Sequence, residues 1–300
     1  MPTITANGIS LYYEAHGPES GEPILLIMGL GAQMTRWPLG FIELLTARGH
    51  HVVAFDNRDC GLSHRFDEAG PADMPAIYGA LLKGEKPNAA YLLADMAADA
   101  VGLLDALGIR KAHVVGASMG GMIAQTVAAE HPGRVLSLTS IMSTTGNPAV
   151  PPATPEASQR LTGVAPDPKA DIEAFLDYGM ASAKVIGSPG YPVEPAEQRA
   201  QLRADYERAF YPVGVSRQMA AIVASGDRRA ALATITAPTI VIHGEDDPLV
   251  RKEGGEDTAA TIPGATLHLI PGMGHNLPKP LWGPVVDLIG EVTARARIGA

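Results

Sequence analysis

The sequence predicts an α/β protein with a mostly parallel sheet flanked by helices and a helical lid insertion. Short apolar, β-branched segments alternate with segments whose apolar residues recur at helical spacing, which is typical of parallel strands joined by right-handed crossovers. The alternation stops after Ser143, where helix-like stretches and prolines replace the strands, and it resumes after Arg229. We therefore expect a core formed by residues 1–143 and 230–300 and a lid formed by residues 144–229.

The chain is expected to begin with an antiparallel pair of strands. Thr3 to Ala6 and Ile9 to Glu14 are strand-like and are joined at Asn7-Gly8, a favoured two-residue hairpin turn. The continuous apolar run Ile24 to Met28 predicts a strand buried on both faces. It leads into a glycine-containing loop, Gly29 to Met34.

Strands and helices then alternate. A helix that ends at Gly49 precedes a strand over His51 to Phe55 and the charged turn Asp56 to Ser63. We interpret the turn as a hydrogen-bond network that fixes the loop, and a catalytic role for its charged residues is the alternative. Residues 65–88 predict an irregular excursion with one short helix. The next helix carries an apolar stripe at helical spacing: Leu93, Met96, Ala97, Ala100, Leu104 and Leu107.

The stretch Ala112 to Ala129 predicts a strand, a sharp turn and a helix. Its turn reads Gly116-Ala117-Ser118-Met119-Gly120, a GxSxG pattern with the serine at the apex. Such a strained turn needs small residues on both sides of the serine because the backbone comes close to neighbouring main chain. A nucleotide-binding turn is the alternative, but the GxGxxG and GxxxxGK[ST] patterns are absent. We therefore expect the Ser118 hydroxyl to be presented at the C-terminal end of a strand.

The insertion follows another buried strand, Val135 to Met142. Three helix-like stretches lie within it: Asp171 to Lys184, Pro195 to Phe210, and Val215 to Ala224. Because it follows the C-terminal end of a strand, the insertion should cover the ligand-binding edge of the sheet as a lid; a separate helical domain on a proline-rich linker is the alternative. The core resumes with strands over Pro238 to His243 and Ala265 to Ile270, and a C-terminal helix follows.

The composition excludes several classes of function. With 46% hydrophobic residues in 300, the chain can bury a large core. A net charge of −9 without a basic stripe argues against nucleic-acid and membrane partners, and the N-terminal residues show no secretion signal, so a cytoplasmic protein is expected. The single cysteine, Cys60, is expected to be a structural thiol. With no HExxH pattern and no Cys and His cluster, we expect no metal and no cofactor. The oligomeric state, including a homo-oligomer, stays open.

The residues that a reactive serine needs occur in the expected order. A serine hydroxyl needs an imidazole to take its proton and a carboxylate to orient that imidazole. His275 follows the last strand in a glycine-rich loop, and we assign it as the base. We choose Asp247 as the acid, while the adjacent Glu245 and Asp246 stay as alternatives. The other histidines are expected in or beside strands (His113, His243 and His268) or exposed at turns and element ends (His16, His50, His51, His64 and His131).

The remaining requirement is a pair of donors for an oxyanion. The N–H of Met119 follows the nucleophile directly, and Leu30, in the loop after the first buried strand, is the second expected donor. The pocket beside them is expected to be apolar. Its predicted walls include Met28, Trp37, Met122, Met142 and Met273.

These motifs identify a resemblance. Met28-Gly29, Arg36-Trp37-Pro38, the turn Asp56 to Ser63, Ala112 to Gly120, Asp247-Pro248 and Ile270 to His275 resemble a bacterial α/β-hydrolase of the esterase type, and the two ends of the chain are similar to the aclacinomycin methylesterase-like branch. The resemblance implies a triad of Ser118, Asp247 and His275 and oxyanion donors at Leu30 and Met119. It does not extend to the insertion. The wider superfamily usually has His-Gly where this chain has Met28-Gly29.

The leading hypothesis is a serine esterase that cleaves small to medium carboxylic esters or lactones through an acyl-enzyme. A serine at position 118 argues against the epoxide hydrolase and haloalkane dehalogenase branches, which need an aspartate there. Two alternatives stay open: a carbon–carbon bond hydrolase or perhydrolase with the same triad, and a hydrolase-fold ligand receptor with little turnover. The expected partner is a small-molecule ester.

Overall fold

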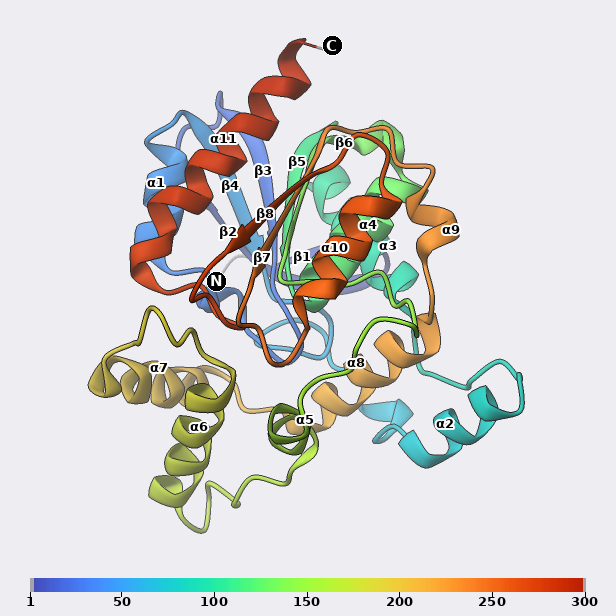
Figure 1. The fold of residues 1–300 in the computed structure, drawn as a ribbon, viewed down its shortest axis with the longest axis vertical. Coiled ribbons are helices and arrows are strands. Elements are labelled where there is room, and N and C mark those ends of the chain that lie inside the picture. The colour runs from blue at the N-terminus through green and yellow to red at the C-terminus, as the bar shows by residue number, and fades with distance from the viewer. Residues whose placement is uncertain (1–2, 299–300) are drawn as a thin grey trace.

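The computed structural model describes residues 3–298, which form an eight-stranded sheet flanked by helices (Figure 1). The strand order is β1-β2-β4-β3-β5-β6-β7-β8. The first two strands form the predicted antiparallel pair and β2 is antiparallel to β4, whereas the other neighbours are parallel, so the predicted mostly parallel sheet is confirmed. The bounds are β1 Thr3–Ala6, β2 Ile9–His16, β3 Glu22–Ile27, β4 His50–Phe55, β5 Ala112–Ala117, β6 Val135–Ile141, β7 Thr239–Gly244 and β8 Thr266–Ile270.

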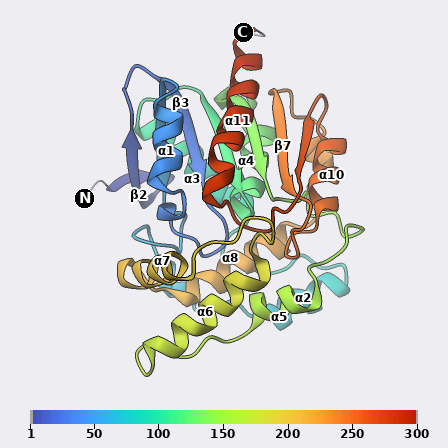
Figure 2. The same ribbon diagram turned by 60° about the vertical axis from the view of Figure 1, so that its left-hand side comes forward.

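Helices cover both faces of the sheet (Figure 2). Side chains of the central strands alternate between two apolar cores, so that Val114 of β5 packs on one face and Val115 on the other. One face is covered by α3 (Leu93–Ala106), α4 (Met119–Glu130) and α10 (Lys252–Thr261), the other by α1 (Leu39–Thr46) and α11 (Trp282–Ile298). Burial on both faces explains why these strands read as continuous apolar runs.

The chain leaves the sheet between β6 and β7 and forms helices beneath the edge where the parallel strands end (Figure 1). These helices are α5 (Pro155–Thr162), α6 (Ile172–Ile186), α7 (Pro195–Arg208) and α8 (Pro212–Ser225). The short α9 (Arg229–Leu232) follows and packs against α4 of the core. The helix expected in the excursion before α3 is α2 (Met74–Leu82), and it packs against α8. Among residues 3–298, no helix is long and apolar enough to cross a membrane.

The charged turn Asp56 to Ser63 is held by its own side chains, as predicted. Asp56 is buried and accepts a hydrogen bond from the backbone N–H of Leu62 at 2.9 Å. Asp59 forms an ion pair with Arg217 of α8 through two contacts of 2.7 Å, and both side chains are buried. Such a pair is costly to break because the remaining charge would stay buried without a partner. The turn therefore fixes α8 to the core.

One histidine prediction is wrong. His50 was expected to be exposed at an element end, but it is 3% exposed. The reason is that β4 begins at His50, which pairs with Glu22 of β3, and its ring lies edge-on to that of His113 with 6.0 Å between centroids.

His113 is buried in β5, as expected for a histidine in a strand. Its Nδ1 lies 2.8 Å from Ser137 Oγ and its Nε2 lies 3.4 Å from a carboxylate oxygen of Glu22. Burial lowers the pKa of His113 to about 4, and the nearby Glu22 carboxylate opposes this shift. The fold therefore favours the neutral imidazole.

This burial predicts a loss of stability in mild acid. The unfolded chain binds a proton at His113 with the ordinary pKa of 6.5, whereas the folded chain does so only near pH 4. Stability is thus fully present above pH 6.5 and falls as the pH decreases toward 4, by about 2 kcal/mol at pH 5. Urea unfolding at pH 7.5 and pH 5 should show a smaller acid-induced loss in His113→Gln than in wild type. An equal loss in the two proteins would contradict the assignment.

Candidate active site

Ser118 occupies a sharp turn between β5 and α4. Its φ of 57° and ψ of −122° are rarely adopted by residues other than glycine. A Cβ at Gly116 would lie 2.0 Å from the carbonyl oxygen of Gly120, and a Cβ at Gly120 would lie 2.0 Å from that of Ile27. The turn therefore requires glycine at both positions.

His275, in the loop after β8, lies between Ser118 and Asp247. Its Nε2 is 2.9 Å from Ser118 Oγ, and its Nδ1 is 2.7 Å from Asp247 Oδ2. The other carboxylate oxygen, Asp247 Oδ1, accepts hydrogen bonds from the backbone N–H groups of Leu249 and Val250, each at 2.9 Å. These two donors turn Oδ2 toward the imidazole. The three side chains thus form one hydrogen-bonded chain.

The structure distinguishes the adjacent acids of this turn. The Asp246 carboxylate accepts a hydrogen bond from the Gly272 N–H at 2.8 Å. Asp247 is 2% exposed and is the acid hydrogen-bonded to His275. Asp246 therefore holds the loop after β8, whereas Asp247 contacts the imidazole.

Two backbone N–H groups belong to segments next to the serine. Met119 is the first residue of α4, and Leu30 lies in the loop after β3, directly after Gly29. A Cβ at Gly29 would lie 3.1 Å from Ser118 Cβ, so this loop passes beside the serine. Within residues 3–298, neither the Leu30 nor the Met119 N–H donates a hydrogen bond to another protein atom. Both groups are thus free to bind an anionic oxygen.

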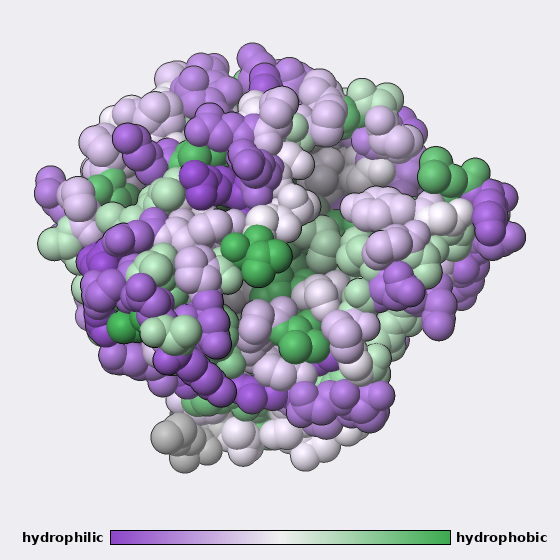
Figure 3. Space-filling view, turned by 90° about the horizontal axis from the view of Figure 1, so that it is seen from below, coloured by the Kyte–Doolittle hydropathy of each residue, from purple (hydrophilic) through white to green (hydrophobic). Residues whose placement is uncertain are grey.

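A cavity of about 800 Å³ opens onto Ser118 and His275. It is bounded by loops at the end of the sheet and by α7 and α8 of the insertion. The face that carries the insertion is hollowed, and apolar side chains gather at the hollow (Figure 3). Four of the sequence-predicted apolar residues line the cavity: Met28, Trp37, Met122 and Met142. The volume suits an organic molecule of the size of a cofactor or a drug.

The prediction for the fifth wall residue, Met273, is wrong. Met273 does not line the cavity; it is fully buried in the core beneath the sheet. It lies in the tight turn after β8, where its N–H donates to the carbonyl of Ile270, and the turn directs the thioether inward. The neighbouring Gly274 N–H donates to Ser188 Oγ, so the turn is itself covered by the insertion.

Cys60 lines the cavity but is 5% exposed. Burial raises the pKa of the Cys60 thiol, and the carboxylate of Asp56 adds to this rise. The neutral thiol is therefore the favoured form, which agrees with the structural role predicted for Cys60.

Comparison with known proteins shows the family. Residues 22–279 match the family model described as the alpha/beta hydrolase fold. The chain belongs to this family.

Two relatives and one solved structure refine the comparison. The rhodomycin D methylesterase DauP of Streptomyces sp. (strain C5) is 30% identical, with 99% of this chain and 100% of that protein covered. The putative carbamate hydrolase RutD of Variovorax paradoxus is 33% identical, with 88% and 89% covered. The first of these confirms the predicted resemblance to the methylesterase branch. The meta-cleavage product hydrolase CumD of Pseudomonas fluorescens has a TM-score of 0.76 at 21% identity, with 99% of this chain and 98% of that chain covered; this similarity shows the fold alone.

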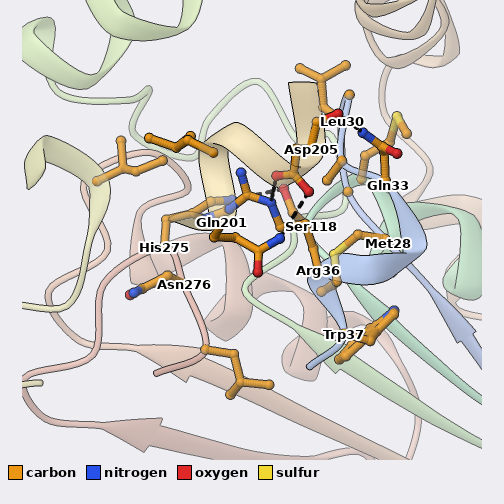
Figure 4. A pocket seen from close by; sticks show the side chains of 18 of the residues that line it. Met28, Leu30, Gln33, Arg36, Trp37, Ser118, Gln201, Asp205, His275 and Asn276 are labelled. Carbon is orange, nitrogen blue, oxygen red and sulfur yellow. Dashed lines mark hydrogen bonds and ion pairs between the residues drawn. The ribbon is translucent and has the colours of Figure 1, made fainter. Parts of the chain in front are cut away.

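The sequence did not reveal the polar side of this hydrolase-family cavity. Arg36, in the segment after β3, forms an ion pair with Asp205 of α7, and both residues line the cavity that Ser118 also lines (Figure 4). Gln33 of the same loop donates hydrogen bonds to the carbonyl oxygens of Asp205 at 2.7 Å and Ala209 at 3.1 Å. The sequence of α7 contains no motif. The polar residues Gln33 and Arg36 in the segment after β3 were therefore the one feature of the sequence that could have indicated polar contacts here.

Proposed function

We propose that this protein is a serine esterase that cleaves small to medium carboxylic esters or lactones through an acyl-enzyme. The observation that carries the proposal is the hydrogen-bonded chain from Ser118 through His275 to Asp247. Ser118 Oγ attacks the ester carbonyl carbon while His275 Nε2 takes the hydroxyl proton, and Asp247 stabilises the resulting imidazolium. The C–O bond then breaks, and the alcohol leaves with the proton from His275.

The second half of the reaction reverses these roles. A water molecule gives its proton to His275 Nε2 and attacks the acyl carbon, and the carboxylic acid leaves as Ser118 regains its proton. The negative oxygen formed in each half accepts hydrogen bonds from the N–H groups of Leu30 and Met119. In other hydrolases, one such donor contributes about 10²- to 10³-fold to kcat.

The cavity supports an ester with a substantial apolar part. Met28, Trp37, Met122 and Met142 supply apolar wall next to the serine. The insertion, residues 144–229, acts as the lid in this proposal because residues of α7 and α8 line the cavity together with the loops of the core. The methylesterase relatives support ester cleavage as the reaction type.

The proposal is tested by acyl-enzyme kinetics and by covalent labelling. Short p-nitrophenyl esters should give a burst of p-nitrophenol equal to the enzyme concentration whenever deacylation is the slower step. A fluorophosphonate should add one equivalent, and peptide mass spectrometry should map it to Ser118. Stoichiometric labelling at another residue, or no labelling together with no turnover, would contradict the proposal.

Substrate profiling separates the alternatives. Carbon–carbon cleavage of vinylogous keto acids, or peracid formation from hydrogen peroxide and an acid, at rates above ester hydrolysis would favour a different reaction on the same three residues. Tight ligand binding with turnover much slower than ligand dissociation would favour a receptor. The cytoplasmic location, the absence of a cofactor and the oligomeric state stay predictions.

A further inference from the structure

Gln218 of α8 connects two loops at the candidate active site, although it lies outside the cavity. Its side chain is fully buried. Its Oε1 accepts a hydrogen bond from the Gly31 N–H at 2.8 Å, and its Nε2 donates to the Arg58 carbonyl oxygen at 2.7 Å. A backbone N–H can only donate and a carbonyl oxygen can only accept, so these partners fix the orientation of the amide.

The hydrogen bond from Gly31 to Gln218 lies next to one of the two proposed oxyanion donors, the Leu30 N–H. Leu30 lies between Gly29 and Gly31, and Gly31 has a φ of 63°. Glycine-containing backbone of this kind has many accessible conformations. The hydrogen bond from Gly31 to Gln218 therefore restricts the segment that carries the Leu30 N–H.

The helix that supplies Gln218 is itself fixed. The adjacent Arg217 forms the buried ion pair with Asp59 described above. A Cβ at Gly214 would lie 2.1 Å from the Asp59 carbonyl oxygen, and a Cβ at Gly31 would lie 2.9 Å from Val215 Cγ2. The start of α8 is thus in close contact with both loops, and Gln218 reaches them from a rigid element.

We propose that Gln218 is a positioning residue for the oxyanion hole, acting through the loop that carries the Leu30 N–H. The inference rests on the proposed function. It implies that α8, although part of the insertion, supports transition-state stabilisation and does not merely cover the substrate. Without the amide, the Gly31 N–H and the Arg58 carbonyl lose their buried hydrogen-bond partner. The loop that carries the Leu30 N–H can then adopt other conformations before the oxyanion forms. A displacement of the donor by about 1 Å can cost about 10²-fold in rate.

The test compares Gln218→Met with Gln218→Glu. Methionine keeps the volume and removes both hydrogen bonds, so kcat on a p-nitrophenyl ester should fall about 10- to 100-fold with little change in KM. A buried glutamic acid can take up a proton, accept from Gly31 and donate to Arg58, so Gln218→Glu should recover most of kcat. Gln159→Met, on the exposed face of α5, is the matched control and should match wild type.

A trifluoromethyl ketone provides the readout that a purely structural role would not change. Its adduct on Ser118 places an oxyanion against the two donors, so its affinity should fall in Gln218→Met by the same factor as kcat/KM. Unchanged kcat and inhibitor affinity in a folded Gln218→Met protein would overturn the inference while the proposed function stands. If that variant does not fold, Gln218→Asn, whose shorter amide cannot reach both partners, replaces it with the same two outcomes. No turnover in wild type would remove the proposed function and this inference together.

Discussion

Replacing Ser118 by alanine should lower kcat for ester hydrolysis by about 10⁶-fold, the size of effect seen when a triad serine is removed from other hydrolases. In the proposed mechanism the Ser118 hydroxyl oxygen forms the acyl-enzyme, and this oxygen lies 2.9 Å from His275 Nε2. Alanine is the informative replacement because it retains the Cβ atom, so the backbone strain at the positive φ of residue 118 stays as in wild type. Glycine would relieve this strain and change the stability of the protein as well as its activity.

The measurement is turnover of a p-nitrophenyl ester together with fluorophosphonate labelling and a thermal unfolding curve. Ser182→Ala is a matched control, since Ser182 lies in α6, bonds to the Tyr178 carbonyl and does not line the cavity. The control should keep wild-type turnover and labelling. Turnover in Ser118→Ala at the wild-type rate would refute the acyl-enzyme mechanism.

Replacing Asp247 by asparagine should lower kcat by about 10⁴-fold, by changing the imidazole tautomer. The Leu249 and Val250 N–H groups both donate to Oδ1, so an asparagine side chain must turn its oxygen toward them and its NH₂ toward His275. His275 Nδ1 would then accept a hydrogen bond, and the proton would lie on Nε2, facing Ser118. An imidazole in that form cannot take the serine proton.

The adjacent residue provides the control for this prediction. Asp246→Asn keeps an oxygen for the Gly272 N–H and should leave kcat within a few-fold of wild type. A loss of about 10⁴-fold in Asp246→Asn with retained activity in Asp247→Asn would reverse the assignment of the acid. Steady-state kinetics on the two variants, with circular dichroism to verify folding, distinguish these results.

The sequence predicted Ser118, Asp247 and His275 together because each residue lies within five positions of the C-terminal end of a strand. In a parallel sheet the C-terminal ends of strands share one edge, so residues at those ends meet in space even when 157 positions separate them, as Ser118 and His275 are. Strands and turns are local signals, and together with the order of the three residues along the chain they were sufficient for this part of the site.

The contributions of the insertion could not be predicted in this way. Gln33 contacts the Asp205 carbonyl across 172 positions, and Gln218 contacts Gly31 across 187. No periodicity or turn pattern encodes such a pairing, which depends on how α7 and α8 are placed against the loops. Met273 illustrates the same limit, since its position past a strand indicated the cavity while the turn geometry directed its side chain into the core.

Helix α10 was not predicted from the sequence, for a different reason. It carries no apolar stripe, and its buried residues are Gly254, Gly255 and Thr258. A Cβ at Gly255 would lie 2.6 Å from His243 Nδ1, so the helix packs by close backbone approach rather than by large side chains. Hydrophobic periodicity cannot detect a helix that contacts its sheet through glycine.

The attachment of α8 by Arg217 and Gln218 has a consequence for engineering by segment exchange. A chimera that replaced residues 144–229 as a unit would break the ion pair to Asp59 and both hydrogen bonds to the neighbouring loops. A graft that ends before Pro212 would import foreign α5, α6 and α7 and keep these contacts. On this basis the useful crossover point for altering substrate range lies between α7 and α8, inside the insertion and not at its ends.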